Sequence, residues 1–403
     1  MTVDLSAAIE HHRQGRLDQA ASLYEAALSR EPDHPDALHL LGLVDLQRGD
    51  VGRAAELLGR AVAVRPNEAN FHATLAEAFW ALGQVDRTVS TYRTALALQP
   101  DHPEFHCNLG ATLVDRGELD EAIGHFREAI RLRPAFAAAF NNLGNALRLK
   151  GERAIAIEQF RMAAQLDPSS VEAWSNLGEM LLDTGNATEA LVHCRHAVGM
   201  RPDSPVALTN LGNVLHNLGR LDEAQACFHE AIAHKPDLAS PHAALAGLLE
   251  ELGDVDQSER ELREALRFDS RHTGALARLA TRLRQNLPDA DRSAIEALLS
   301  DPALAARDRF MLQFGLAQVY DARGDFTRAF LLARQADELQ QADFQARGQA
   351  YDPNAHRALV DRLIATFTGD FFARVRSFGL PTRRPVFVVG LPRSGTTLVE
   401  QIL

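Results

Sequence analysis

The 403-residue sequence predicts a mainly α fold: a solenoid of repeated helix pairs, followed by the first strand, loop and helix of an α/β domain. Three observations predict this arrangement. Glycine, proline and alanine each recur every 34 residues through the first two-thirds of the chain. The chain is also longer than one compact core usually is. Finally, the last part of the sequence changes to a β-branched run followed by a glycine-bounded turn.

Each 34-residue unit is predicted to be a pair of antiparallel helices. The recurring prolines are Pro32, Pro66, Pro100, Pro134, Pro168, Pro202 and Pro236. The recurring glycines are Gly15, Gly49, Gly83, Gly117, Gly151, Gly185, Gly219 and Gly253. The recurring alanines are Ala27, Ala61, Ala95, Ala129, Ala163, Ala197, Ala231 and Ala265.

The unit at residues 103–136 shows why these residue types recur. Gly117 is predicted to end the first helix, because the turn there requires a residue that tolerates positive φ. Pro134 prevents the second helix from continuing. The two helices of this unit are predicted over residues 106–116 and 119–132. The two helices are predicted to cross closely at three small residues: Gly110, Ala122 and Ala129.

This period and these residues resemble the tetratricopeptide repeat. Eight repeats are predicted in register over residues 1–272, although Ser270 stands where the last proline is expected. The predicted order after them is a degenerate repeat and helical break at 273–309, a final repeat-like helix pair at 310–343, a helical linker at 344–384 and the start of a further domain at 385–403.

The resemblance implies a solenoid whose concave face is lined by the first helix of each pair. The sixth position of that helix is asparagine in four consecutive repeats: Asn108, Asn142, Asn176 and Asn210. Since an amide both donates and accepts hydrogen bonds, such a ladder can bind an extended peptide backbone. The ladder resembles the one in the superhelix of the O-linked N-acetylglucosamine transferase. Alternatively, the amides bond a neighbouring repeat, and the sequence does not separate the two interpretations.

The carboxyl-terminal stretch predicts an anion-binding turn. Residues 386–389 are Val-Phe-Val-Val, which is typical of a strand buried on both faces. The next residues, 390–397, have the spacing of a P-loop, but Thr396 occupies the lysine position and Arg393 supplies a cation within the loop. Backbone N–H groups of such a turn and the following helix favour an anion.

The residues from Pro392 to Thr397 resemble the 5′-phosphosulfate-binding loop of sulfotransferases, in the P-R-S-G-T-T form of the tyrosylprotein and bacterial branch. The resemblance implies that the donor 3′-phosphoadenosine 5′-phosphosulfate (PAPS) is contacted by Arg393, Ser394, Gly395, Thr396 and Thr397. It also implies transfer of a sulfuryl group to a hydroxyl acceptor such as a protein tyrosine. The catalytic base is unknown and is expected beyond Leu403, so the chain as given is expected to be inactive alone.

A competing hypothesis is a non-catalytic repeat protein that binds a peptide or protein partner. An ATP or GTP hydrolase is disfavoured by the missing loop lysine. A glycosyltransferase is disfavoured because the repeats lead into a P-R-S-G-T-T loop.

Composition limits the other function classes. A formal net charge of −12 argues against nucleic-acid binding. The three cysteines show no C-x-x-C pairing, which indicates a reduced compartment, and no metal site is predicted, because Cys194 of the sequence His193-Cys-Arg-His196 falls at a core position. Without a visible signal peptide or membrane-spanning run, a cytoplasmic location without membrane contact is expected.

Overall fold

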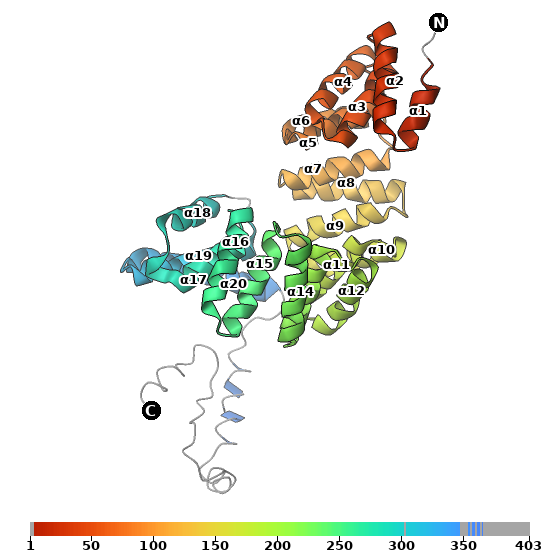
Figure 1. Ribbon diagram of the computed structural model, residues 1–403. Helices are drawn as coiled ribbons and strands as arrows, with labels where there is room; N and C mark the ends of the chain where they lie inside the picture. The colour runs from red at the N-terminus through yellow and green to blue at the C-terminus, as the bar shows by residue number, and fades with distance from the viewer. Residues whose placement is uncertain are drawn as a thin grey trace. The chain divides into compact units, whose positions relative to one another are not determined.

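The computed structural model describes residues 4–301, residues 304–346 and six residues of the following segment: 354, 357, 358, 361, 362 and 365. Between residues 6 and 346 the described chain forms twenty α-helices and one short 3₁₀ helix, without a β-strand (Figure 1). The chain divides into two compact units, Met1–Asp337 and Glu338–Leu403. The prediction of a mainly α repeat solenoid is therefore confirmed over the described part of the chain.

Successive helices pair as the A and B helices of eight repeats. The A helices are α1 (Ser6–Arg13), α3 (Pro35–Arg48), α5 (Ala69–Ala81), α7 (Pro103–Asp115), α9 (Ala137–Lys150), α11 (Val171–Asp183), α13 (Pro205–Asn217) and α15 (Ala239–Glu251). The B helices are α2 (Leu17–Arg30), α4 (Val51–Val64), α6 (Val85–Leu98), α8 (Leu119–Leu132), α10 (Arg153–Leu166), α12 (Ala187–Met200), α14 (Leu221–His234) and α16 (Val255–Phe268).

The pairs stack in chain order, as Figure 1 shows for the first unit. Each A helix packs against its own B helix, and each B helix packs against the A helix of the next pair. Neighbouring A helices also contact one another directly, as in the pairs α3 with α5, α7 with α9, α11 with α13 and α13 with α15. The A helices therefore form a closely spaced layer of their own.

Left-handed glycines make the turns within the pairs. All eight recurring glycines, from Gly15 to Gly253, have positive φ between 71° and 85°. Gly324 has φ 82° and makes the same kind of turn later in the chain. Only glycine adopts this conformation without steric cost, which explains why the residue recurs at this position.

A second type of recurring glycine allows the helices of a pair to cross closely. A Cβ added to Gly110 would lie 2.7 Å from a ring carbon of Phe126, and one added to Gly212 would lie 2.4 Å from a ring carbon of Phe228. Both phenylalanines are fully buried. The glycine of one helix thus makes room for the aromatic ring of its partner.

The predicted helix bounds of the repeat at 103–136 were correct for one helix and wrong for the other. The second helix, α8, spans the predicted residues 119–132. The first helix, α7, begins at Pro103, three residues before the predicted start at residue 106, and ends at Asp115. Proline at the first helical position needs no N–H partner and has the φ of a helix, so it begins the helix instead of preceding it.

The repeat register breaks after α16. The elements there are α17 (Thr273–Leu283), the 3₁₀ helix η1 (Arg284–Asn286), α18 (Asp289–Leu299), α19 (Ala306–Ala322) and α20 (Phe326–Ala346). The final helix pair was predicted to begin at Phe310, but α19 begins four residues earlier, at Ala306. Arg309 fixes this earlier turn by donating hydrogen bonds to the carbonyl oxygens of Leu299 (2.7 Å) and Asp301 (2.5 Å).

α19 packs against α17 as closely as the two helices of a regular pair pack against each other. Thr273 Oγ1 donates a 2.8 Å hydrogen bond to Asp308 Oδ1, between residues 35 positions apart. The same separation joins A helices elsewhere, as in the 3.0 Å bond from Trp80 Nε1 to Asp115 Oδ2. α17 packs directly against α19, where a Cβ on Gly315 would lie 2.9 Å from the carbonyl oxygen of Ala277.

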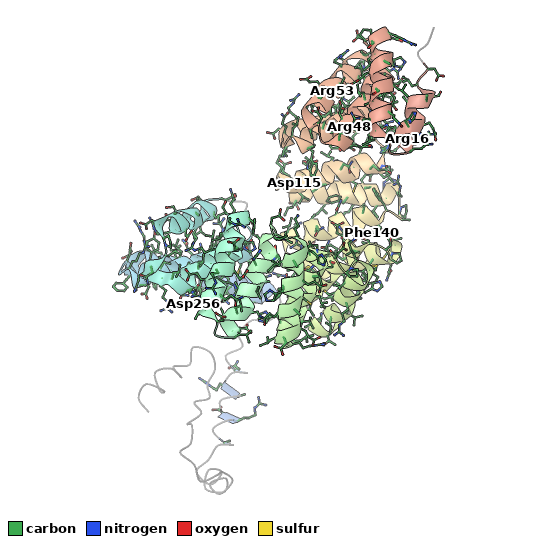
Figure 2. The ribbon with its side chains drawn as sticks, viewed as in Figure 1. Arg16, Arg48, Arg53, Asp115, Phe140 and Asp256 are labelled. Atoms are coloured by element: carbon green, nitrogen blue, oxygen red, sulfur yellow. The ribbon has the colours of Figure 1, made fainter. Side chains whose placement is uncertain are left out.

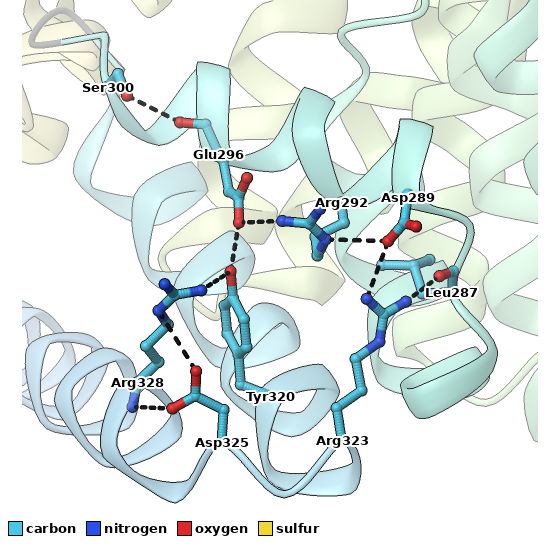
Figure 3. Close-up of polar contacts among 9 residues, drawn as sticks. All are labelled: Leu287, Asp289, Arg292, Glu296, Ser300, Tyr320, Arg323, Asp325 and Arg328. Carbon is cyan, nitrogen blue, oxygen red and sulfur yellow. Dashed lines mark hydrogen bonds and ion pairs between the residues drawn. The ribbon is translucent and has the colours of Figure 1, made fainter.

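A polar network holds α18, α19 and the start of α20 together (Figure 3). Tyr320 Oη donates to Glu296, which also accepts a 2.7 Å bond from Arg292. Arg323 reaches Asp289 at 3.1 Å and the carbonyl oxygen of Leu287 at 2.5 Å. These bonds add to an apolar core, in which Ile295 and Leu298 of α18 are buried in one cluster with Leu316 of α19.

The predicted strand, loop and helix at 385–403 lie outside the described residues. Much of the predicted linker at 344–384 lies outside them too, but residues 354, 357, 358, 361, 362 and 365 are helical. None of the described helices is both long and apolar enough to cross a membrane.

Candidate peptide-binding face

The A-helix layer lies on the inside of the bend in the array. Arg307, at the start of α19, forms a 3.0 Å ion pair with Asp183, at the end of α11, although 124 residues separate them. Three helix pairs separate α19 from the pair that contains α11, so the array must curve toward the end of α11 for these two side chains to meet. We call the surface of the A helices α5, α7, α9, α11 and α13 at their positions six, nine, twelve and thirteen the inner face.

Each asparagine of the predicted ladder is half-buried and bonds the preceding repeat. Asn108 hydrogen-bonds Tyr92 of α6. Asn142 Nδ2 donates to Cys107 Sγ at 3.4 Å. Asn176 Nδ2 donates to Asn141 Oδ1 at 3.0 Å, and Asn210 Nδ2 donates to the carbonyl oxygen of Ser175 at 3.3 Å.

These bonds explain part of the asparagine pattern without a ligand, because each amide ties one A helix to the repeat before it. An asparagine side chain has two N–H donors and one acceptor oxygen. For Asn142, Asn176 and Asn210 only one donor is used among the described residues. The second N–H and Oδ1 therefore remain for another partner, and peptide binding by the ladder stays a prediction.

Carboxylates follow the amides one turn later on the inner face. Glu77 and Glu179 both occupy position nine of their A helices. Burial raises the pKa of each carboxyl group, and for Glu179 the cation of Arg148, 3.7 Å away, opposes this effect. The side chain of Glu179 is nonetheless 42% exposed. A group that is surrounded by protein and still reached by solvent lies on a recessed surface.

Trp80 is the main feature of the inner face that sequence reasoning missed. Its side chain is 56% exposed at position twelve of α5, and its indole N–H donates to Asp115, which is labelled at the end of α7 in Figure 2. Exposed tryptophan is common among residues that contribute most to protein binding. A signal was available, since the 34-residue register places Trp80 where Val114 and Leu182 stand in later repeats.

The cysteine and histidine candidates are accounted for by packing. Cys194 is fully buried against Gly178, while the rings of His193 and His196 lie 5.2 and 4.9 Å from the ring of Trp174. Among the described residues no three His, Cys, Asp or Glu side chains are grouped to hold a metal ion. The predicted PAPS-binding residues Arg393, Ser394, Gly395, Thr396 and Thr397 lie outside the described residues.

Comparison with known proteins agrees with the repeat architecture. One profile described as a tetratricopeptide repeat matches residues 11–78 and 181–240, and a second with the same description matches residues 73–135, 107–170 and 141–205. An uncharacterized protein of Aquifex aeolicus (strain VF5) is 38% identical over 115 residues, or 28% of this chain. The chain spans 14% of the length of that relative.

Solved structures show the same fold. A tetratricopeptide repeat protein from Parabacteroides merdae superposes with a TM-score of 0.52 at 14% identity, covering 61% of this chain and 97% of that one. The APC/C hetero-tetramer Cut9–Hcn1 has a TM-score of 0.52 at 16% identity, covering 67% of this chain and 53% of that one. With the matched profiles together spanning residues 11–240, the helical array of this chain belongs to the tetratricopeptide-repeat family.

Proposed function

We propose that the repeat array is an interaction scaffold that holds an extended segment of a partner protein along its inner face. The observation that carries this proposal is the row of half-buried amides, each with hydrogen-bonding groups that the neighbouring repeat does not use. An unpaired polar group on a recessed surface gains most from a partner that supplies peptide N–H and C=O groups. Proteins of this family bind peptide or protein partners, which supports the proposal.

The test is peptide selection followed by a blocking substitution. Random peptides displayed on phage are selected against the chain, and the enriched peptides are synthesised with a fluorescent label for anisotropy measurements. Asn145→Trp places a large ring at position nine of α9, on the inner face. It is expected to weaken peptide binding by about tenfold or more, because the ring occupies the space of the peptide.

The matched control is Ala154→Trp, which adds the same ring at an exposed position of the B helix α10. Peptide affinity is expected to stay unchanged in this variant, while circular dichroism checks that both variants remain helical. Equal affinity in the two variants would show that binding does not use the inner face, and the proposal would then be wrong.

A second candidate function is PAPS-dependent sulfuryl transfer to a hydroxyl acceptor, with the repeats holding the acceptor or its carrier. Its support is the P-R-S-G-T-T sequence of residues 392–397 and the resemblance stated for it. The cation of Arg393 would grip the phosphosulfate and stabilise charge on the leaving phosphate.

This candidate is tested by calorimetric titration of PAPS into the full natural protein that contains this chain. Arg393→Ala is expected to weaken binding by about tenfold or more, because a charge-assisted hydrogen bond is lost. Arg383→Ala, which removes a nearby arginine outside the loop, serves as the control. Absence of PAPS binding, or equal binding by the two variants, would rule this function out.

A further inference from the structure

We infer that the partner segment is basic, and that its arginine or lysine side chains bind the inner face at two acidic positions. The inference deepens the proposed scaffold function and rests on it. The first, called the Trp80 position, consists of Glu77, Trp80 and Asp115. The second, called the α11 position, consists of Glu179 and Asp183.

The Trp80 position combines an aromatic face with two carboxylates. Glu77 precedes Trp80 by three residues in α5, so their side chains share one side of that helix. Asp115 accepts the indole N–H at 3.0 Å and thereby fixes the ring. Burial alone raises the pKa of Glu77, with no cation opposing it, and among the described residues Asp115 bonds the indole N–H without an ion pair. An exposed indole face beside uncompensated carboxylates attracts a guanidinium or ammonium group.

The α11 position already holds a guanidinium from elsewhere in the chain. Arg307 of α19 donates a 3.0 Å hydrogen bond to Asp183 Oδ1. Arg307 therefore occupies the site that we assign to a partner's arginine. Its side chain is 65% exposed, so the pair is solvated and weakly held. A basic segment that lies along the inner face can displace Arg307 and donate an equivalent hydrogen bond to Asp183.

The carboxylate of Glu179 at the α11 position lies near Arg148 but is not hydrogen-bonded to it. The 3.7 Å separation of Arg148 from Glu179 is longer than a hydrogen bond, and the pKa of Glu179 is raised mainly by burial. A cation of the partner placed beside Glu179 and Asp183 would therefore gain more electrostatic interaction free energy than a cation placed beside an exposed carboxylate of the B helices.

The inference is tested with the phage-displayed peptides selected against the chain. Peptides selected against the chain at physiological salt are expected to be enriched in arginine and lysine. A labelled peptide from this set is expected to bind Asp183→Asn about tenfold more weakly, the equivalent of one lost charge-assisted hydrogen bond. Binding of the same peptide is expected to quench Trp80 fluorescence in a Trp174→Phe background, where Trp80 is the sole tryptophan.

Two control variants separate local binding from the attraction of an acidic chain for any basic peptide. Asp222→Asn removes one negative charge from an exposed position of α14 and is expected to change affinity less than about twofold. Arg307→Gln is expected to strengthen binding by about threefold, since it removes the competing guanidinium, whereas Arg195→Gln on α12 is expected to leave it unchanged. Circular dichroism verifies that each variant is folded.

Three results would contradict the inference, and they differ in what they imply for the scaffold function. If Asp222→Asn weakens binding as much as Asp183→Asn, only net charge is involved and the inference is wrong. If enriched peptides lack basic residues yet are blocked by Asn145→Trp, the inference is wrong and the scaffold function stands. If no enriched peptide is sensitive to Asn145→Trp, the scaffold function fails and the inference fails with it.

Discussion

A ring N–H at the fourth position of several A helices makes the same bond to the turn before the helix. It donates to the carbonyl oxygen of the proline six residues earlier, at distances of 2.8 to 3.1 Å. The pairs are His72 with Pro66, His106 with Pro100, Trp174 with Pro168 and His242 with Pro236. A carbonyl oxygen only accepts, so the Nε2 atom of each histidine carries a proton.

The environments of two histidines give them opposite effects on stability as pH changes. His242 lies with Nδ1 2.7 Å from Glu261 Oε2 while Nε2 bonds Pro236, so both ring nitrogens donate. The hydrogen bond with Glu261 raises the pKa of His242. The contribution of His242 to stability is therefore fully present below the unfolded-state pKa and is lost as pH rises through the raised value.

The variant His242→Gln tests the direction of this pH dependence of stability. The glutamine amide can still donate to Pro236 but carries no charge, so the loss of unfolding free energy in this variant is expected to be larger at pH 5.5 than at pH 8. Urea denaturation at the two pH values measures the difference. Glu261→Gln should abolish the same pH dependence, and a loss that is equal at both values would contradict the assignment.

His39 shows the reverse behaviour. Its Nε2 lies 2.9 Å from Thr74 Oγ1 and its ring stacks on Phe71 at 4.5 Å. Burial lowers its pKa to about 4, although Asp36 opposes the shift. Since the unfolded chain takes up a proton near its ordinary value, stability is expected to fall between pH 6.5 and pH 4, by up to about 3 kcal/mol. In the His39→Gln variant, the unfolding free energy measured by urea denaturation should no longer fall over this pH range. An unchanged fall would contradict the lowered pKa of His39.

At the scale of single helices, two glycines within helices have different physical roles. Gly212 in α13 faces Phe228, whereas a Cβ on Gly199 in α12 would meet no atom within 4 Å. Gly212→Ala is expected to lower the unfolding free energy by about 1–3 kcal/mol, because the buried ring must move. Gly199→Ala is expected to raise it by about 0.5–1 kcal/mol, because alanine favours the helix.

The same substitution thus has opposite signs at two sites only 13 positions apart, which chemical denaturation can measure. Destabilisation by Gly199→Ala, or stabilisation by Gly212→Ala, would mean that the helix crossings are looser than their contacts indicate.

The helix bounds show where local sequence signals were sufficient. α8 begins and ends where predicted because Gly117 and Pro134 limit it on both sides. α19 was misplaced because its first turn is held by Arg309 bonds to Leu299 and Asp301, in a different element. The break before it also contains Arg284 with φ 48°, the single positive φ outside glycine among the described residues. No glycine or proline marks that conformation in the sequence.

At the scale of the whole molecule, each described repeat contacts mainly its neighbours, so stability should be local rather than global. Gly212→Ala is expected to accelerate amide hydrogen exchange in α11 to α16 and to leave exchange in α1 to α4 unchanged. Hydrogen exchange with mass spectrometry at peptide resolution measures both. Equal acceleration throughout the array would show that the chain unfolds as one cooperative unit.

The sequence by itself determined the repeat length, the helix pairing and the small residues at the helix crossings, because each depends on local rules that recur every 34 residues. It also placed Asn108, Asn142, Asn176 and Asn210 on one face, since a fixed period puts equivalent side chains in equivalent positions. The resemblance of residues 392–397 to a PAPS-binding loop remains a prediction from sequence.

Only the tertiary structure decided what those amides bond and which side chains surround them. Asn176 donates to Asn141, Trp80 is held by Asp115, and Arg307 reaches Asp183 from 124 residues away. Such contacts depend on the small rotation between successive repeats, which accumulates along the array. No residue pattern within one repeat specifies that sum, because the packing of each pair against the next determines it.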